Sequence, residues 1–254
     1  MSFNDKVVIV TGGSSGIGAA IAVEFSGLGA KVTIVGRNET KLKEVAKKCK
    51  NPLTVVADIT KENDIKKIVT ETLNRFGKID ILINNAGMAI QAGILAENAM
   101  ETYDKVMNTN LRSAVYLTHL AAPHIVKTKG NIINISSIAS LTVFGNDHFS
   151  YGASKAAMDH FTRSIAAELA SSGVRVNSVN PGPVRTDFLE NMGVEKKAEQ
   201  DAMFEEFGRT ATALGRVSDS EEIADLVIFL ASDKARGITG SVFVTDNGSL
   251  VKPK

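Results

Sequence analysis

Short runs of β-branched and aliphatic residues alternate along the chain with longer stretches of amphipathic pattern. The short runs are continuously hydrophobic, which favours strands buried on both faces, as in a parallel sheet. The predicted strands span Val7–Val10, Val32–Val35, Leu53–Val56, Ile79–Ile83, Asn131–Ile135, Val174–Val179 and Val242–Val244. The predicted helices span about Gly16–Leu28, Glu39–Lys48, Lys61–Phe76, Tyr103–Lys127, Tyr151–Ser171 and Asp219–Ala231.

This repeated strand–helix–strand order predicts a doubly wound α/β domain, with a seven-stranded parallel sheet and helices on both faces. No linker, repeat or low-complexity segment interrupts the order, so we predict one domain over residues 1–254. The segment Ser218-Asp219-Ser220-Glu221 precedes the last apolar helix and fits a capping box.

Composition narrows the function classes. Hydrophobic residues make up 44% and charged residues 22% of the 254 residues, as in a globular protein. The net charge of +1 gives no reason to expect nucleic acid or an anionic membrane as partner. One cysteine, Cys49, cannot form an internal disulfide, and no signal peptide, membrane-length apolar run or terminal targeting signal is visible. We expect a cytoplasmic protein and assign no metal site.

Candidate chemistry begins with Tyr151, which precedes Lys155 by four residues. In a helix the two side chains share one face, and a nearby cation favours the phenolate, so such a tyrosine can exchange a proton with an alcohol or carbonyl. A surface helix can also set this spacing by accident. Neither Tyr103 nor Tyr116 has a lysine four residues later.

A glycine-rich segment, Thr11-Gly12-Gly13-Ser14-Ser15-Gly16-Ile17-Gly18, joins the first strand to the first helix. Its glycines allow a sharp turn and let a pyrophosphate approach the helix N-terminus. The alternative is a glycine-rich turn without a ligand. The position inside a strand–helix–strand unit favours a dinucleotide site.

The end of the second strand indicates which dinucleotide is preferred. An acid there favours NAD, but this strand ends in Gly36-Arg37-Asn38. A guanidinium suits the additional phosphate of NADP, so we predict NADP(H), with NAD(H) possible. Arg37 could instead cap a surface loop, and Ser15 is neutral where a second basic residue would have supported NADP.

Together these features resemble the short-chain dehydrogenase/reductase family, a Rossmann-fold family, nearly end to end, and most of all its 3-oxoacyl-carrier-protein reductase-like members. The matching segments are Thr11–Gly18, Asp58, Asn84-Asn85-Ala86-Gly87, Asn108-Thr109-Asn110-Leu111, Ile135-Ser136-Ser137, Tyr151 with Lys155, and Asn180-Pro181-Gly182-Pro183-Val184-Arg185-Thr186.

The resemblance implies a mechanism in which hydride passes between the nicotinamide and a carbonyl or secondary alcohol. Tyr151 would exchange the proton, and Lys155 would lower the pKa of Tyr151 and hold the nicotinamide ribose. Ser137 would hydrogen-bond the carbonyl oxygen, and Asn110 would position a water that reconnects Lys155 to solvent.

The cofactor contacts and the assembly follow from the same resemblance. The long helices over Tyr103–Lys127 and Tyr151–Ser171 would pack between subunits in a homotetramer or homodimer. The implied cofactor-binding residues are Gly12, Ser14, Ser15, Gly16, Ile17, Gly18, Arg37, Asn38, Asp58, Ile59, Asn85, Ala86, Gly87, Tyr151, Lys155, Pro181, Gly182, Val184 and Thr186.

Some of these matches have competing interpretations. Ser136 is as polar as Ser137 and adjacent to it, and Asn108 competes with Asn110. Asp58 could serve only as the start signal of the following helix.

Two departures from the family pattern bear on the substrate pocket and the C-terminal turn. The spacing from Ser137 to Tyr151 is 14, one longer than the commonest family spacing, which places an extra residue in the loop 138–150. Asn247 stands where the family usually has glycine, and we expect it to tolerate a left-handed backbone.

Substrate specificity is expected in two apolar segments, and an apolar pocket would favour a hydrophobic ketone such as a steroid, retinoid, fatty or aromatic carbonyl. His148 could hydrogen-bond a polar group of the substrate or simply be solvated. The segment 187–214 could be a lid or an ordinary amphipathic helix pair. The apolar residues are Leu141, Val143, Phe144 and Phe149 in the loop, and Leu189, Met192, Met203, Phe204 and Phe207 in the segment.

The leading prediction is an NADP(H)-dependent carbonyl reductase or secondary-alcohol dehydrogenase. An NAD-dependent alcohol dehydrogenase is the alternative within the enzyme class, and Arg37 argues against it. A catalytically silent dinucleotide-binding regulator is the alternative outside it, and the presence of Tyr151 and Lys155 argues against that.

Overall fold

A computed structural model describes residues 1–143, 145–187, 194 and 196–253. Seven parallel strands form one sheet in the order β3-β2-β1-β4-β5-β6-β7, which confirms the predicted fold class. The strands are β1 (Val7–Thr11), β2 (Lys31–Gly36), β3 (Leu53–Val56), β4 (Ile81–Asn84), β5 (Asn131–Ile135), β6 (Arg175–Pro181) and β7 (Val242–Thr245).

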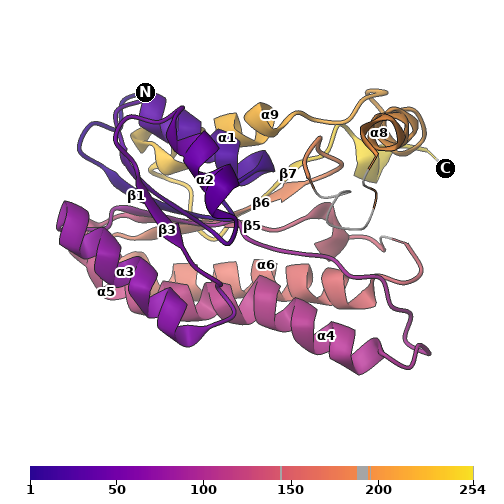
Figure 1. The fold of residues 1–254 in the computed structure, drawn as a ribbon, viewed down its shortest axis with the longest axis horizontal. Coiled ribbons are helices and arrows are strands. Elements are labelled where there is room, and N and C mark those ends of the chain that lie inside the picture. The colour runs from indigo at the N-terminus through magenta and orange to yellow at the C-terminus, as the bar shows by residue number, and fades with distance from the viewer. Residues whose placement is uncertain (144, 188–193, 195, 254) are drawn as a thin grey trace.

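Helices cover both faces of the sheet, and α8 (Lys197–Ala211) lies beyond them near the C-terminus (Figure 1). One face carries α1 (Gly16–Gly27), α2 (Glu39–Ala46) and α9 (Ser220–Ala231). The other face carries α3 (Glu62–Phe76), α4 (Ala99–Met107), α5 (Ser113–Thr128) and α6 (Phe149–Leu169).

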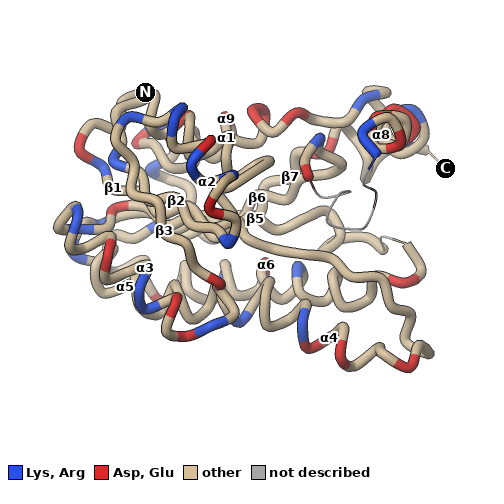
Figure 2. The backbone as a smooth tube through the Cα atoms, in the orientation of Figure 1, with Lys and Arg blue, Asp and Glu red and all other residues tan. Residues whose placement is uncertain are grey.

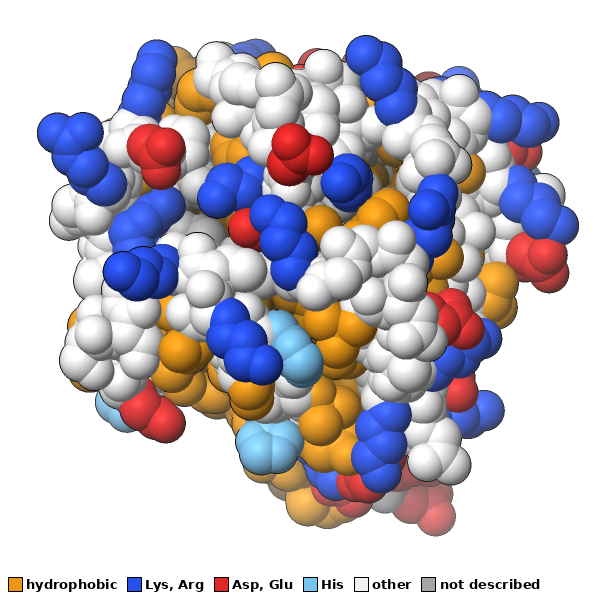
Figure 3. Space-filling view, turned by 90° about the vertical axis from the view of Figure 1, so that its left-hand side faces the viewer, with side chains coloured by type: hydrophobic (Ala, Val, Ile, Leu, Met, Phe, Trp, Pro, Cys, Tyr) orange, Lys and Arg blue, Asp and Glu red, His pale blue; other side chains and the backbone are white. Residues whose placement is uncertain are grey.

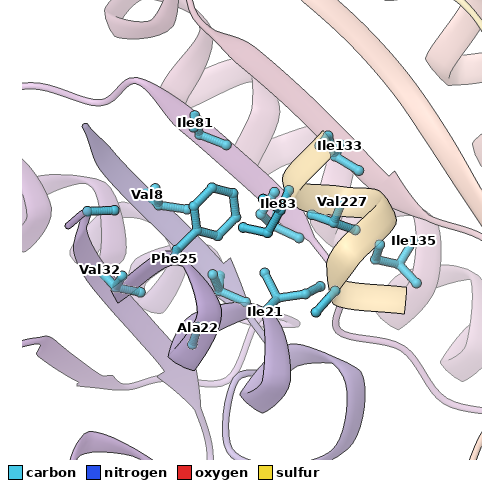
Figure 4. Packing of buried hydrophobic residues seen from close by; sticks show 14 of the residues in the cluster. Val8, Ile21, Ala22, Phe25, Val32, Ile81, Ile83, Ile133, Ile135 and Val227 are labelled. Carbon is cyan, nitrogen blue, oxygen red and sulfur yellow. The ribbon is translucent and has the colours of Figure 1, made fainter. Parts of the chain in front are cut away.

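Alternation along the buried strands creates two separate cores. Val8 packs in the cluster under α1 and α9, and its neighbour Ile9 packs in the cluster under α3 and α5, because successive strand residues point to opposite faces. Figure 4 shows Phe25 and Ile21 of α1 packed toward the sheet and toward Val227 of α9. Charged residues lie mainly on the helices and loops, and the middle of the sheet is nearly uncharged (Figure 2).

The helix predicted over Tyr103–Lys127 is wrong in detail. It begins earlier, at Ala99, and is divided into α4 and α5 by a π-helical turn, η1 (Asn108–Arg112). A π turn inserts one extra residue into the helical ladder, and here the inserted turn carries Asn110 to a buried position. Apolar periodicity alone did not reveal this turn.

Two local predictions near the C-terminus have different outcomes. The capping box lies one residue later than predicted: Asp219 is the N-cap of α9, and its amide donates to the Glu222 carboxylate at 2.9 Å. Asn247 adopts a φ of 49°, so the predicted left-handed backbone is confirmed. Within the described residues, no helix has the length and apolar character needed to cross a membrane.

All seven strands run in the same direction, so their carboxyl ends share one edge of the sheet, where open α/β sheets bind ligands. The face at the left of Figure 1, seen directly in Figure 3, is rich in Lys and Arg side chains. Lys6, Lys31 and Lys78 stand at or just before the amino ends of strands and pair with Asp5 or Asp80. These basic residues therefore belong to the edge opposite the carboxyl ends.

Candidate active site

The glycine segment after β1 has the backbone that the sequence predicted. Gly12 and Gly16 have φ values of 64° and 51°, which only glycine adopts at low cost. At Gly18 a Cβ atom would overlap the Gly12 carbonyl, so α1 can approach the loop this closely only with glycine. Asn85 holds the loop from the end of β4, its Nδ2 donating to the Thr11 carbonyl at 2.8 Å.

The start of α1 is arranged to accept an anion. Its first turn contains no acidic residue, and the extended Ser15 makes no side-chain cap hydrogen bond. A Cβ on Gly16 would lie 2.9 Å from Thr186 Cγ2, so the segment that follows β6 passes beside the loop. A phosphate group would therefore meet free N–H groups and the positive end of the helix dipole.

At the adenosine end of the predicted site, Arg37 is exposed after β2, and Asn38 caps α2 by accepting the Lys41 amide at 3.0 Å. Burial raises the pKa of Asp58, but hydrogen bonds from Thr60 and the charges of Arg37 and Lys61 outweigh burial and lower it. The backbone bond from Thr60, at 3.0 Å, shows that Asp58 also shapes the entry to α3.

Tyr151 and Ser137 meet where α6 begins beside the carboxyl end of β5. The Tyr151 phenol is hydrogen-bonded to the Ser137 side chain. Burial raises the pKa of Tyr151, and this hydrogen bond works in the opposite direction without reversing the shift. Without a bound ligand, Tyr151 is therefore protonated at neutral pH, contrary to the lowered pKa that the sequence predicted.

Lys155 lies one turn further along α6 and is 4% exposed. Its Nζ donates to the Ile135 carbonyl at 2.8 Å and lies 5.7 Å from the centroid of the Tyr151 ring. Burial lowers the pKa of Lys155 to about 8, and the negative charge of Asp159 opposes that shift.

Asn110 reaches the same region from η1. Its amide donates to the Met88 carbonyl at 2.9 Å and to Ser154 Oγ at 3.0 Å, and its oxygen accepts the Met88 amide at 2.8 Å. A Cβ on Gly87 would lie 3.4 Å from both Asn110 Oδ1 and Lys155 Nζ. Glycine at position 87 thus keeps the space between these two side chains open.

The structure separates the two adjacent serines by environment. Ser136 is buried and its hydroxyl donates to the Lys155 carbonyl at 3.1 Å, so it joins β5 to α6. Ser137 is only partly buried and faces Tyr151. Between the two asparagines, Asn110 is buried and links η1 to residues 88 and 154, whereas Asn108 is partly exposed.

Of the predicted specificity segments, Phe144, Leu189 and Met192 lie outside the described residues. In α8 the buried Phe204 packs with Val217 and against the Arg185 guanidinium, whose Cζ lies 5.3 Å from the ring centroid. The described part of 187–214 contains the helix α8, which packs through Phe204 against Val217 and Arg185. Met203 and Phe207 belong to the same apolar cluster.

The loop before α6 is tied to the loop after β4, because the Ala92 amide donates to the Asp147 carbonyl at 2.8 Å. His148 is buried, with Nδ1 2.8 Å from an Asp147 carboxylate oxygen, so it is not the solvated loop histidine considered from the sequence. Leu141 and Val143 are exposed on the same loop.

Two residues near the site were not predicted from the sequence. Ser154 receives the Asn110 amide and donates to the Tyr151 carbonyl at 2.7 Å, which joins η1 to α6. Thr11 receives the amides of Asn85 and Ala86 on its hydroxyl, at 3.0 and 3.1 Å. Both residues lie inside recognised motifs, but only the contacts between elements reveal what they connect.

Comparison with known proteins agrees with this arrangement. The family described as enoyl-(acyl carrier protein) reductase matches residues 12–249. L-fucose dehydrogenase of Mus musculus is 34% identical over 97% of this chain and 89% of its own length. A 3-oxoacyl-[acyl-carrier-protein] reductase of Thermotoga maritima is 34% identical over 99% of this chain and its full length.

Solved structures are similar over the whole chain. A Caenorhabditis elegans short-chain dehydrogenase/reductase of unknown function, crystallised with cofactor, superposes with a TM-score of 0.94 at 36% identity, over 99% of this chain and 97% of that one. A glucose dehydrogenase from the same organism, in its apo form, gives 0.82 at 38% identity, over 99% and 100%. The chain therefore belongs to the short-chain dehydrogenase/reductase family of oxidoreductases.

Proposed function

We propose that the protein transfers hydride between NADP(H) and a carbonyl or secondary alcohol, with Tyr151 as the proton-exchanging group. One observation carries this proposal: the Tyr151 phenol is hydrogen-bonded to Ser137 and lies over the buried Lys155, at the sheet edge that also holds the glycine loop. A phenol, a hydroxyl and an ammonium at one point are suited to binding and protonating a carbonyl oxygen.

The residues present fit a dinucleotide, because no side chain caps α1 at Ser15 and its first turn carries no acidic residue. When bound, the nicotinamide supplies or accepts the hydride. The loop amides from Gly12 to Gly18 would hold the pyrophosphate. The contact between Gly16 and Thr186 supports placing the segment from Pro181 to Thr186 next to them.

The remaining cofactor contacts are assigned by element. Arg37 and Asn38 would hold the adenosine phosphate, with Asp58 and Ile59 beside the adenine. Asn85, Ala86 and Gly87 would line the cofactor site, and Lys155 would bind the nicotinamide ribose. Arg37 supports the preference for NADP because it is exposed, so its charge is available to a phosphate.

In the direction of reduction, Tyr151 would give its proton to the carbonyl oxygen while Ser137 stabilises the charge developing there. The phenol is protonated at neutral pH, which is the form that can donate this proton. In oxidation Tyr151 would take the proton, which requires the positive charge of Lys155. Asn110 would position a water beside Lys155 through the gap at Gly87.

We propose a hydrophobic ketone as substrate. The two tied loops beside Tyr151 carry exposed apolar side chains, with Leu95 97% and Val143 86% exposed. Burying such side chains against an apolar substrate is favourable. Ile94, Leu141 and Leu214 are also exposed.

The test is the steady-state oxidation of NADPH and NADH by purified protein over a panel of aromatic, steroid, retinoid and fatty ketones. We expect turnover of at least one ketone with NADPH preferred. The relatives named for fucose and glucose justify a second panel, in which NAD⁺ reduction by L-fucose and glucose is measured. Turnover only in the second panel would favour an NAD-dependent alcohol dehydrogenase. Tight NADPH binding without turnover in either would favour a regulator.

We also propose a homotetramer or homodimer in the cytoplasm. The side of the molecule formed by α4, α5 and α6 is a continuous helical layer, which supports packing between subunits through these helices (Figure 1). Light scattering coupled to size exclusion measures the mass directly. A mass corresponding to one 27.0 kDa chain would contradict the assembly.

A further inference from the structure

Among the described residues, two carboxylates are buried, Asp80 and Asp159, and they have different environments. Asp80 lies just before β4, at the edge opposite the candidate site, and pairs with Lys6 and Lys78. Asp159 lies on α6 and is 3% exposed. In the described part of the chain, no Lys or Arg nitrogen lies within ion-pair distance of Asp159, so its partners are of another kind.

Asp159 joins α6 to β6 through hydrogen bonds, and Asn180 of β6 extends these bonds to Ser137 and Ser140. One oxygen lies 2.9 Å from the Ser178 hydroxyl, which is also 2.6 Å from Asn180 Oδ1, and the other oxygen accepts from the Asn180 amide at 2.8 Å. The same amide nitrogen is within hydrogen-bond distance of the Ser137 carbonyl, at 3.1 Å, and of Ser140 Oγ, at 2.9 Å. The orientation of Asn180, and with it the backbone of Ser137, therefore depends on the Asp159 carboxyl.

Asp159 is also four residues after Lys155, so both side chains lie on the sheet-facing side of α6, one turn apart. The ionisable groups that face Lys155 are Tyr151 and Asp159 of α6. From β5, Lys155 contacts the neutral Ile135 carbonyl, and from β6, Asp159 contacts the neutral Ser178 and Asn180. An anion one helical turn away, in a site shielded from water, favours the charged ammonium.

We propose that Asp159 is a positioning residue, whose buried carboxylate keeps Lys155 protonated and, through Asn180, fixes the backbone of Ser137. The consequence of Asp159 for catalysis rests on the proposed function. The effect of Asp159 on the charge of Lys155 does not rest on it, because this effect is present in the protein without any substrate. The pKa of Lys155, lowered by burial to about 8 and raised by Asp159, agrees with this arrangement.

The test is a pH titration of the Lys155 ammonium by nitrogen-15 NMR of the lysine side chains, in the full-length protein and in Asp159→Asn. Removing the charge should move the Lys155 titration about one pH unit lower. Ser178→Ala removes one hydrogen bond but keeps the charge, and Asp104→Asn removes an exposed charge on α4. Both controls should leave the titration unchanged.

An unchanged Lys155 titration in Asp159→Asn would mean that Asp159 does not set the charge of Lys155, and the proposal would be wrong. The NMR measurement needs no turnover, so it tests the inference about Lys155 independently of activity. Absence of activity on every substrate panel would overturn the proposed function alone. Where turnover exists, the pH at which kcat/KM falls should move with the Lys155 titration.

Because Asp159 is buried, the Asp159→Asn variant could fail to fold, so a second measurement uses the unaltered protein. The nitrogen-15 shift of Lys155 Nζ should be that of an ammonium at pH 7. A neutral amine at that pH would overturn the proposal, because Asp159 would then not keep Lys155 protonated.

Discussion

Tyr151 shows how one phenol can be held between two opposing effects. Burial favours its protonated form, and hydrogen bonding to Ser137 favours the phenolate. Burial also lowers the pKa of Lys155, four residues later, to about 8. In the absence of ligand the balance favours the protonated phenol, the form that a ketone reductase needs.

Tyr151→Phe removes the hydroxyl and keeps the ring. We expect kcat to fall about 10²–10⁴-fold, because general acid–base transfer contributes this much, while NADPH affinity changes little. Tyr116→Phe makes the same change on α5, away from the site, and should leave kcat unaltered. Carbonyl reduction by Tyr151→Phe at the rate of the unaltered protein would exclude Tyr151 as the proton donor.

Arg37→Ala should lower the ratio of kcat/KM for NADPH to that for NADH. A charge-assisted bond to a phosphate is worth about 1.5–3 kcal/mol, so the ratio should drop at least tenfold. Arg75→Ala, at the exposed end of α3, serves as the control and should not change it. A ratio that stays the same in Arg37→Ala would remove Arg37 from the assigned phosphate site.

At the scale of elements, the start of α1 is governed by contact between helix and loop rather than by helix propensity. A Cβ at Gly18 would overlap the Gly12 carbonyl and lie 2.5 Å from Asn85 Nδ2, whereas a Cβ at Gly27 of the same helix would have no atom within 4 Å. Position 18 therefore requires glycine, and position 27 has room for a side chain.

Gly18→Ala should destabilise the protein by about 1–3 kcal/mol, as overpacking does, and weaken dinucleotide binding by displacing α1 from the loop. Gly27→Ala should be neutral or stabilise by up to about 1 kcal/mol, because alanine has the better helix propensity. Urea unfolding and fluorescence titration with NADPH measure both effects. Equal stabilities of the two variants would contradict the close approach at Gly18.

At the scale of the molecule, one sheet separates two hydrophobic cores that share no side chain. Phe25 of α1 is fully buried on one side, with its ring 4.9 Å from that of Phe3, and Leu117 of α5 is buried on the other. Both cores contain residues of the same strands, so disruption of one core disturbs strands that also carry residues of the other. We therefore predict that the chain unfolds as one unit.

Phe25→Ala should cost about 3–5 kcal/mol and Leu117→Ala about 2–5 kcal/mol of unfolding free energy. Each should shift a single transition seen both by circular dichroism and by calorimetry. Val251→Ala, at an exposed position near the C-terminus, should change stability by less than about 0.5 kcal/mol. Two separate transitions in either core variant would contradict the single-domain prediction.

The sequence by itself determined the fold class, because continuous β-branched runs can satisfy their hydrophobicity only when both faces are covered. It also determined the strand positions, the glycines that need positive φ and the side chains that gather at the carboxyl ends. These features follow from local periodicity or from residue types with one strong conformational preference, and periodicity is visible without a partner element.

Tertiary structure decided the rest. Only packing between α4, α6 and the Met88 segment reveals the π turn that buries Asn110, since its sequence continues an ordinary helical pattern. Only burial decides that the pKa of Tyr151 is raised rather than lowered. Ionisation depends on solvent exclusion and on partners from other elements, such as Ser137 beside Tyr151. Those contacts exist only once the chain has folded.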